Sequence, residues 1–250
     1  MDVLAFLISA IIHDYKHPGL NNNYLINTKN DIALIYNGNI YLILDQSILE
    51  NYHVAESFRL IHSKKDCNIF SDLPPQHYKV IRKRIIDCVI STDMTLHTKQ
   101  CTYLKIKMES YGIKQGDNVD KIMEGLDSVA TFAIQQEFLN VLIHAADISN
   151  PTKPMNVYNV WIDKIMEEFW NQGDKEKSLK LPVSFLCDRV TTNIPKAQLG
   201  CIENIVAPLV NSVIEYFPGL IFLLQNLNDN KTHLKKVIEE ETKRESEKKK

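Results

Sequence analysis

Side chains that commonly bind divalent metals gather in the stretch H-D-Y-K-H-P-G, which covers residues 13–19. A mostly apolar run over 3–12 leads directly into His13 and Asp14. Taking a carboxylate out of water is costly unless a cation or several hydrogen bonds compensate it. Imidazole and carboxylate groups are also the ligands that divalent metals take from proteins. A helix-end aspartate that caps backbone N–H groups beside a core histidine is the commoner explanation, so this pair alone establishes no metal site.

Two further pairs of polar residues have a spacing that suits chemistry. Glu50 and His53 lie at positions i and i+3, so they share a helix face and can point at one centre. Glu-x-x-His pairs recur in the metal sites of helical bundles, although this spacing more often serves a surface salt bridge. Thr92 and Asp93 interrupt the apolar stretch 85–94, and local hydrogen bonding to the backbone is the usual reason for that.

A second helix-end carboxylate strengthens the case for a metal. His144 and Asp147 repeat the i, i+3 spacing, and Asp147 closes a strongly apolar helix as Asp14 does. Two such carboxylates in one core would repel each other unless a cation lay between them. We therefore predict that the side chains of Asp14 and Asp147 lie close together with His13 beside them. The residues favour a metal over separate structural roles by a small margin only.

Composition and charge limit the functional class. The chain has 250 residues, of which 44% are apolar and 24% charged, as in ordinary globular proteins. Its formal net charge of −2 provides no basic field for nucleic acid or an anionic membrane. The five cysteines are odd in number and form no C-x-x-C motif, which favours reduced thiols in the cytoplasm over a disulfide framework or a cysteine zinc site.

The elements that position these residues are predicted to be helices, because glycines are few and strand-type alternation is scarce. We expect one all-α domain over 1–238, followed by a charged, disordered tail over 239–250. No run reaches the roughly 18 apolar residues that span a bilayer, so no membrane segment is predicted in this chain. The predicted helices cover 3–12, 31–36, 47–61, 77–97 with a continuation through 94–111, 130–147, 157–170 with Gly173 as its C-cap, and 195–222 as a helix pair.

Longer strings carry a resemblance that is far more specific than any single pair. In order along the chain they are H-D-Y-K-H-P-G-L-N-N-N-Y-L-I-N-T (13–28), S-I-L-E-N-Y-H (47–53), S-T-D-M (91–94), H-A-A-D-I-S-N-P-T-K-P (144–154), W-I-D-K-I-M-E-E-F-W-N-Q-G-D-K-E (161–176) and A-Q-L-G (197–200). With these strings the chain closely resembles the catalytic domain of class I 3′,5′-cyclic-nucleotide phosphodiesterases, from residue 1 to about 238.

The resemblance implies a compact, multi-helix domain of the His-Asp (HD) type that holds two divalent metals, Zn²⁺ and Mg²⁺ or Mn²⁺. By position, His13, Asp14 and Asp147 match the family's ligands of the tightly held metal, with Asp14 bridging to the second one. A hydroxide between the metals attacks phosphorus while the metals absorb charge on the phosphate oxygens.

The same resemblance assigns further catalytic and substrate-binding positions. His17, Glu50 and Thr92 match residues that hold waters of the second metal, and Glu168 matches the residue that orients the general acid. The remaining positions surround the purine. Gln198 matches the glutamine that hydrogen-bonds the purine edge, and Ile165 and Cys201 match the two sides of the clamp on the base. The residues that match positions at the purine end of the pocket are Asn150, Tyr158 and Trp161.

Three departures from the family pattern bear on activity. The family carries an upstream H-N-x-x-H motif that supplies the general acid and a metal ligand, and none of the 250 residues forms it. We therefore expect a domain truncated at its N-terminus, with its first helices missing. Cys201 replaces an aromatic clamp residue, and losing an aromatic contact with a base costs roughly 1–3 kcal/mol. Residues 38–44 are a predicted insertion, either a loop or the product of a retained intron or gene-model error.

The expected function is metal-dependent hydrolysis of cAMP or cGMP to the 5′-monophosphate, impaired in this chain by the missing motif. The resemblance also allows a dimer and a cytoplasmic location, with upstream segments able to attach the full-length protein to a membrane. Two alternatives stay open. One is another enzyme of the wider His-Asp metallophosphohydrolase class, against which Gln198 and the 144–154 string argue. The other is a catalytically dead domain that binds nucleotides or protein partners.

Overall fold

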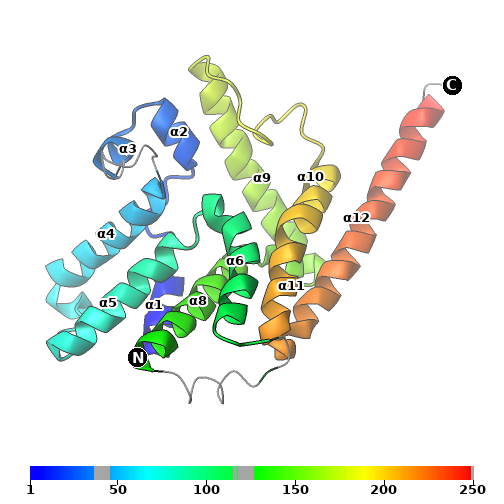
Figure 1. Cartoon of the computed structure of the whole chain (residues 1–250). Helices are drawn as coiled ribbons and strands as arrows, with labels where there is room; N and C mark the ends of the chain where they lie inside the picture. The colour runs from blue at the N-terminus through cyan, green and yellow to red at the C-terminus, as the bar shows by residue number, and fades with distance from the viewer. Residues whose placement is uncertain (37–45, 115–116, 118–126, 249–250) are drawn as a thin grey trace. The chain divides into compact units, whose positions relative to one another are not determined.

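The structure is a computed structural model that describes residues 1–36, 46–114, 117 and 127–248 (Figure 1). Within these ranges every regular element is a helix, so the predicted all-α class is confirmed. The chain divides into two compact units, one of residues 1–114 and 118–146 and one of residues 115–117 and 147–250. The predicted single domain over 1–238 stays a prediction. The predicted insertion over 38–44 lies outside the described residues.

The centre of the first unit is formed by three helices, α1 (Asp2–Ile12), α4 (Ile48–Ser63) and α5 (Pro75–Ile90). Figure 1 shows α4 and α5 running side by side, and α1 packs most closely on α5. Ala5 and Ile8 supply the inner face of α1, and their partners recur at helical spacing on α4 and α5. The core side chains are Ala5, Ile8, Val54, Phe58, Ile61, Phe70, Ile81, Ile85 and Val89.

Four more α-helices lie in the described part of the first unit. The short helices α2 (Asn22–Asn27) and α3 (Asp31–Tyr36) cover the start of α4, where Leu25 and Ile48 are fully buried. Helix α6 (His97–Ser110) and the long helix α8 (Ser128–Asp147) form the other side of the unit. Arg84 of α5 connects α1 to α8, because its guanidinium donates to Asp2 and to the carbonyl oxygen of Phe132.

The second unit is built around α9 (Met155–Ser178), which packs with α10 (Ile194–Cys201), α11 (Ala207–Tyr216) and α12 (Ile221–Lys248). A π-helical turn, Ile202–Val206, joins α10 to α11. The core of the second unit contains Tyr158, Ile162, Met166, Ile202, Val206, Val210, Leu227 and Leu234.

The helical run Ile194–Tyr216 has a mean hydropathy of 1.3 and is long enough to cross a membrane. The run includes Lys196 and Glu203, so it is not a stretch of consecutive apolar residues, and it lends several buried side chains to the core. The predicted absence of a membrane segment stays a prediction.

The predicted helix over 77–111 is wrong in one respect, because it is interrupted. Helix α5 ends at Ile90, a tight turn and the 3₁₀ segment Met94–Leu96 follow, and α6 begins at His97. The cause is Asp93, whose side chain accepts a hydrogen bond from the backbone N–H of Thr95 (2.8 Å). A side chain that bonds its own backbone in this way competes with helix formation.

The predicted C-cap at Gly173 is also wrong, because α9 continues through Gly173 to Ser178. A Cβ atom at this position would lie 1.8 Å from the backbone oxygen of Cys187. The glycine therefore permits a close approach of the chain at Cys187 to α9, and the helix absorbs the cost of a glycine in its interior. The sequence shows the glycine but does not show which segment comes near it.

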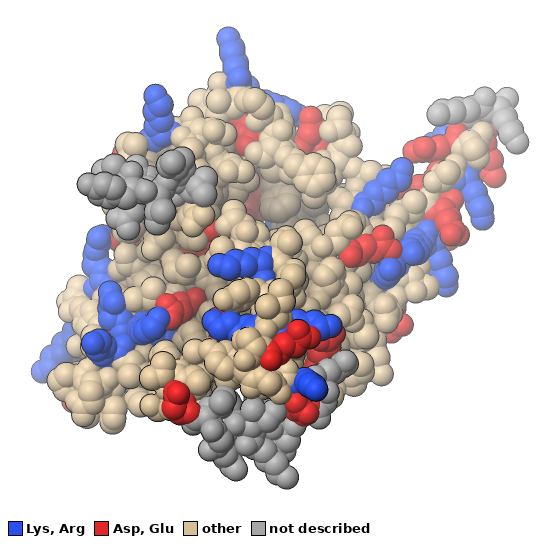
Figure 2. Space-filling view, in the orientation of Figure 1, with Lys and Arg blue, Asp and Glu red and all other residues tan. Residues whose placement is uncertain are grey.

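The charged segment after 238 differs from the predicted disordered tail, because α12 continues as a helix to Lys248. Figure 2 shows acidic and basic side chains interspersed along this exposed end of α12. Glu, Lys and Arg are good helix formers, and an ion pair such as Glu240 with Arg244 adds a few tenths of a kcal/mol at spacing i, i+4. Local propensity therefore favours a helix here, and Glu241 also accepts a hydrogen bond from the side-chain amide of Asn193 (3.2 Å).

Candidate functional site

The end of α1 places the first two predicted ligands side by side. The Nδ1 atom of His13 donates to the carbonyl oxygen of Ala10 (2.9 Å), because a carbonyl can only accept. That hydrogen bond turns the other ring nitrogen, Nε2, toward Asp14, whose Oδ2 atom lies 3.4 Å away. A backbone carbonyl that fixes the tautomer and orientation of an imidazole is the usual support of a metal-ligating histidine.

Two more imidazoles converge on Asp14 from other elements. Ligand atoms of Asp14, His17 and His53 all lie within 4.8 Å of one another. His53 comes from α4 and is buried, and its Nδ1 donates to the carbonyl oxygen of Tyr15 (2.7 Å). The ring of His17 stacks on that of His53 with centroids 5.5 Å apart, and its Nδ1 accepts from the N–H of Gly19. This arrangement brings one carboxylate and two imidazoles to one point.

The electrostatics of this group suit metal ligation. Loss of surrounding water alone would raise the pKa of Asp14, but its hydrogen bond with His13 and the nearby charges of His13, His17 and His53 lower it by more. Burial lowers the pKa of His53, and this outweighs the opposing effects of the Tyr15 carbonyl and Asp14. The carboxylate is therefore ionised and His53 neutral at pH 7, which are the forms that bind metals.

Glu50 lies at the start of α4 among polar groups from three elements. Its Oε2 atom accepts from the side-chain amide of Asn22 (3.2 Å), and the Asn22 oxygen accepts from the backbone N–H of Leu49 (3.0 Å). Burial, and next the charge of Asp93, raise the pKa of Glu50 to about 7. Thr92 is buried beside Asp93, and its hydroxyl donates to the carbonyl oxygen of Val89.

The raised pKa of Glu50 gives a testable pH dependence. The folded chain binds this proton more tightly than the unfolded chain, in which the pKa is near 4.5. Protonated Glu50 therefore adds its full contribution to the free energy of unfolding at low pH, and this contribution is lost as the pH rises to about 7. We expect Glu50→Gln to stabilise the metal-free chain by about 2 kcal/mol more at pH 8 than at pH 5. Urea unfolding at both pH values measures this, with Glu109→Gln on the exposed face of α6 as the control; equal shifts for both variants would contradict the assignment.

The last predicted metal ligand, Asp147, is the final residue of α8 and begins the long segment of the second unit, 147–250. One turn earlier on the same helix, buried His144 lies 2.9 Å from buried His97 of α6, measured from Nε2 to Nδ1. This contact fixes the end of α8 against α6. The predicted meeting of Asp147 with Asp14 stays a prediction.

The second unit contains the predicted substrate-binding residues. The Tyr158 hydroxyl lies 2.9 Å from Oε1 of Gln198, both side chains are buried, and the Gln198 amide nitrogen lies 3.8 Å from the sulfur of Met166. Burial raises the pKa of Tyr158, so its hydroxyl stays protonated. Cys201 is partly buried against the same core, and burial raises the pKa of its thiol.

The other predicted positions of this unit are less enclosed. Ile165 is half-buried on α9, Trp161 and Glu168 are exposed on the same helix, and Asn150 begins a 3₁₀ turn before it. Tyr158 and Gln198 are thus the pair that the structure brings together directly.

His53 is the site residue that our predicted set omitted. The Glu-x-x-His spacing of Glu50 and His53 did place both on one face of a helix, but a salt bridge explained that spacing equally well. The structure separates the two explanations, because His53 is buried and faces Asp14 while Glu50 bonds to Asn22. Only the position of the loop after α1 shows that this histidine has a carboxylate neighbour.

Comparisons with known proteins show what this chain is similar to. Residues 1–227 match the sequence model of the 3′5′-cyclic nucleotide phosphodiesterase family. A probable 3′,5′-cyclic-AMP phosphodiesterase of Caenorhabditis elegans is 37% identical over 242 residues, which cover 96% of this chain and 34% of the relative. Isoform F of a Drosophila melanogaster 3′,5′-cyclic-AMP phosphodiesterase is 36% identical over 239 residues, with coverages of 95% and 34%. This chain therefore spans about a third of the length of these relatives.

A solved structure extends the likeness to the fold. The phosphodiesterase domain of the RhoPDE fusion protein from the choanoflagellate Salpingoeca rosetta superimposes with a TM-score of 0.82 at 30% sequence identity. The match covers 97% of this chain and 70% of that domain.

Proposed function

Because this chain belongs to the 3′5′-cyclic nucleotide phosphodiesterase family, a family of hydrolases, we propose that the protein cleaves the cyclic phosphodiester of a 3′,5′-cyclic nucleotide, with cAMP as its substrate. The observation that carries the proposal is the convergence of Asp14, His17 and His53 in the first unit. The names of the relatives in Caenorhabditis and Drosophila support cAMP.

The residues of the first unit fit divalent cations. The donor set is a carboxylate with imidazoles, and backbone carbonyls hold His13 and His53 in fixed orientations. His13 and Asp14, together with Asp147, would hold one metal, and His17, Glu50 and Thr92 would hold the waters of a second. Bound divalent metals neutralise charge on the phosphate oxygens and activate water for attack on phosphorus.

The chain's own residues then have distinct tasks. Asp14, ionised at neutral pH, supplies negative charge where the metals bind. In the second unit, Gln198 would hydrogen-bond the edge of the purine while the Tyr158 hydroxyl orients its amide. Ile165 and Cys201 would hold the base between apolar surfaces, with Asn150 and Trp161 at the same end. Glu168 would orient a general acid from the H-N-x-x-H motif.

The test restores that motif. A chimaera joins residues 1–250 to the segment of a related phosphodiesterase domain that carries H-N-x-x-H, and cAMP and cGMP hydrolysis are measured with Mg²⁺ and Zn²⁺ present. We expect turnover of cAMP that Asp14→Ala reduces at least about a thousandfold. A folded chimaera without turnover would contradict the proposed enzyme and favour the alternative, a nucleotide- or protein-binding module.

A further inference from the structure

The residue that starts α4 has an unusual backbone. Ser47 lies at φ 52° and ψ 44°, in the left-handed region that residues with a Cβ atom rarely adopt. A serine at this position ordinarily accepts a hydrogen bond from the first turn of its helix, but the Ser47 side chain makes no such bond. Its hydroxyl instead donates to Oδ2 of Asp93 over 2.6 Å. Strained residues of this kind persist only where their surroundings hold them.

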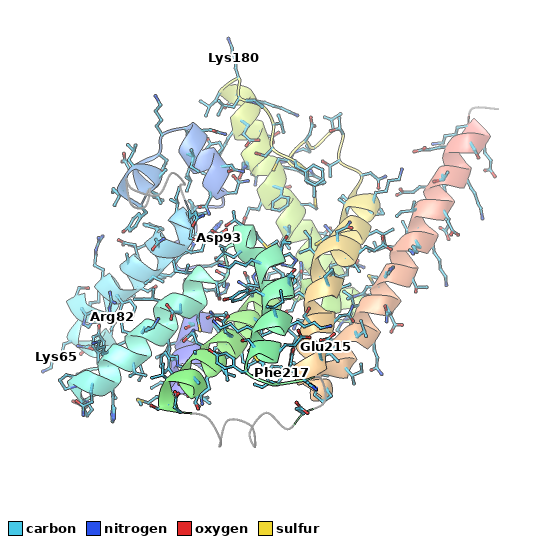
Figure 3. All side chains as sticks on the ribbon, in the orientation of Figure 1. Lys65, Arg82, Asp93, Lys180, Glu215 and Phe217 are labelled. Carbon is cyan, nitrogen blue, oxygen red and sulfur yellow. The ribbon has the colours of Figure 1, made fainter. Side chains whose placement is uncertain are left out.

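Asp93 joins two helix ends that are distant in the sequence. It follows the end of α5, and both of its carboxylate oxygens are used, Oδ2 by the Ser47 hydroxyl and Oδ1 by the N–H of Thr95. Ser47 is 6% and Asp93 2% exposed, so neither partner can replace the other with water. Figure 3 shows Asp93 beside the N-terminal end of α4. The hydrogen bond therefore fixes the first turn of α4 from the side of α5.

Glu50 lies in that first turn, three residues after Ser47. The Asn22 side chain holds the same turn by accepting from the N–H of Leu49 and donating to Glu50. The charge of Asp93 acts on Glu50 and contributes, after burial, to its raised pKa. Glu50 thus has a direct hydrogen bond from Asn22 and feels the charge of Asp93.

We propose that Ser47 and Asp93 are positioning residues, whose hydrogen bond fixes the first turn of α4 and so holds the Glu50 carboxyl group at the candidate metal site. The metal role of Glu50 rests on the proposed function, whereas the placement of Glu50 does not. The left-handed backbone of Ser47 is what directs its hydroxyl to Asp93. Glycine would adopt that backbone without strain but would have no hydroxyl to donate.

Ser47→Gly therefore separates positioning from stability. In the metal-free chain, the Glu50 carboxyl titration is followed by ¹³C NMR, and stability by the urea midpoint. We expect the pKa of Glu50 to fall toward its ordinary value, because the freed turn lets the carboxyl group reach water and leave Asp93. The urea midpoint should fall less than in Ser47→Ala, because both variants leave buried Asp93 without the Ser47 donor and only glycine relieves the strained backbone. Binding of Mn²⁺ alone, followed by electron paramagnetic resonance, should weaken about tenfold or more, as when the support of a ligand is removed.

Two further variants complete the test. Ser47→Ala removes the hydroxyl but keeps the strained backbone, so it should show the same change at Glu50 with a lower urea midpoint. Ser57→Ala is the matched control: Ser57 is buried on the same helix, and its hydroxyl has no hydrogen-bond partner among the described residues. It should change neither the Glu50 titration nor Mn²⁺ binding.

Each outcome decides one of the two proposals. An unchanged Glu50 titration in Ser47→Gly overturns the positioning role, as does a loss of Mn²⁺ binding that is larger in Ser47→Ala than in Ser47→Gly in proportion to its lower urea midpoint. If the chimaera that carries H-N-x-x-H binds no Mn²⁺, the proposed metal function fails, and the Glu50 titration still decides the positioning role.

Discussion

A polypeptide of residues 1–250 alone should hydrolyse cAMP at least about a thousandfold more slowly than the chimaera that contains H-N-x-x-H. A general acid contributes roughly 10²–10⁴ in rate. The missing metal ligand should weaken metal binding by at least the roughly 10–100-fold that loss of a supporting residue costs. Hydrolysis of radiolabelled cAMP by both proteins, with Zn²⁺ and Mg²⁺ added, measures the difference.

The structure explains why another histidine should not replace the missing acid. The Nε2 atom of His53 lies 3.8 Å from Oδ1 of Asp14, but its Nδ1 proton is donated to the Tyr15 carbonyl and burial lowers its pKa. Its Nε2 atom therefore carries no proton to give to a leaving alkoxide. His97 is buried against His144. Rapid turnover by residues 1–250 that is lost in His53→Ala would contradict this prediction and identify His53 as the acid.

Replacing Arg84 by alanine should destabilise the first unit by about 3 kcal/mol or more. Arg84 is only 1% exposed, and its guanidinium donates to the Phe132 carbonyl (2.9 Å) and to the side chains of Gln135 and Gln136 (2.8 and 3.2 Å). It also lies 3.7 Å from the centroid of the Phe132 ring. Removing it leaves one buried and two partly buried acceptors without this donor. Urea unfolding followed by circular dichroism measures the loss.

Asp2→Asn provides the matched comparison for Arg84. Asp2 is the charged partner of Arg84 at 3.0 Å, but its side chain is 38% exposed, so water can replace the lost ion pair. We expect a loss below about 1 kcal/mol for this variant. If the two variants are equally destabilised, the ion pair with α1 and not the hydrogen bonds to α8 accounts for the role of Arg84.

The fold class and most helices follow from local patterns. Helices at 3–12, 31–36, 47–61 and 130–147 were predicted to within three residues of their observed ends, because their apolar residues recur at helical spacing. The interruption between α5 and α6 was not predictable in the same way. It depends on Asp93, which is held by Ser47 from a helix 46 residues earlier in the chain.

By itself the sequence determined the helical class, the family resemblance and the ligand-type residues His13, Asp14 and His17, because these depend on residue type and spacing. Tertiary structure decided which partners those residues have. It brought His53 to Asp14, gave Glu50 the neighbours that raise its pKa, and turned Gly173 from an expected helix end into a point of close approach. Each of these depends on contacts between distant segments, and burial and charge act through space.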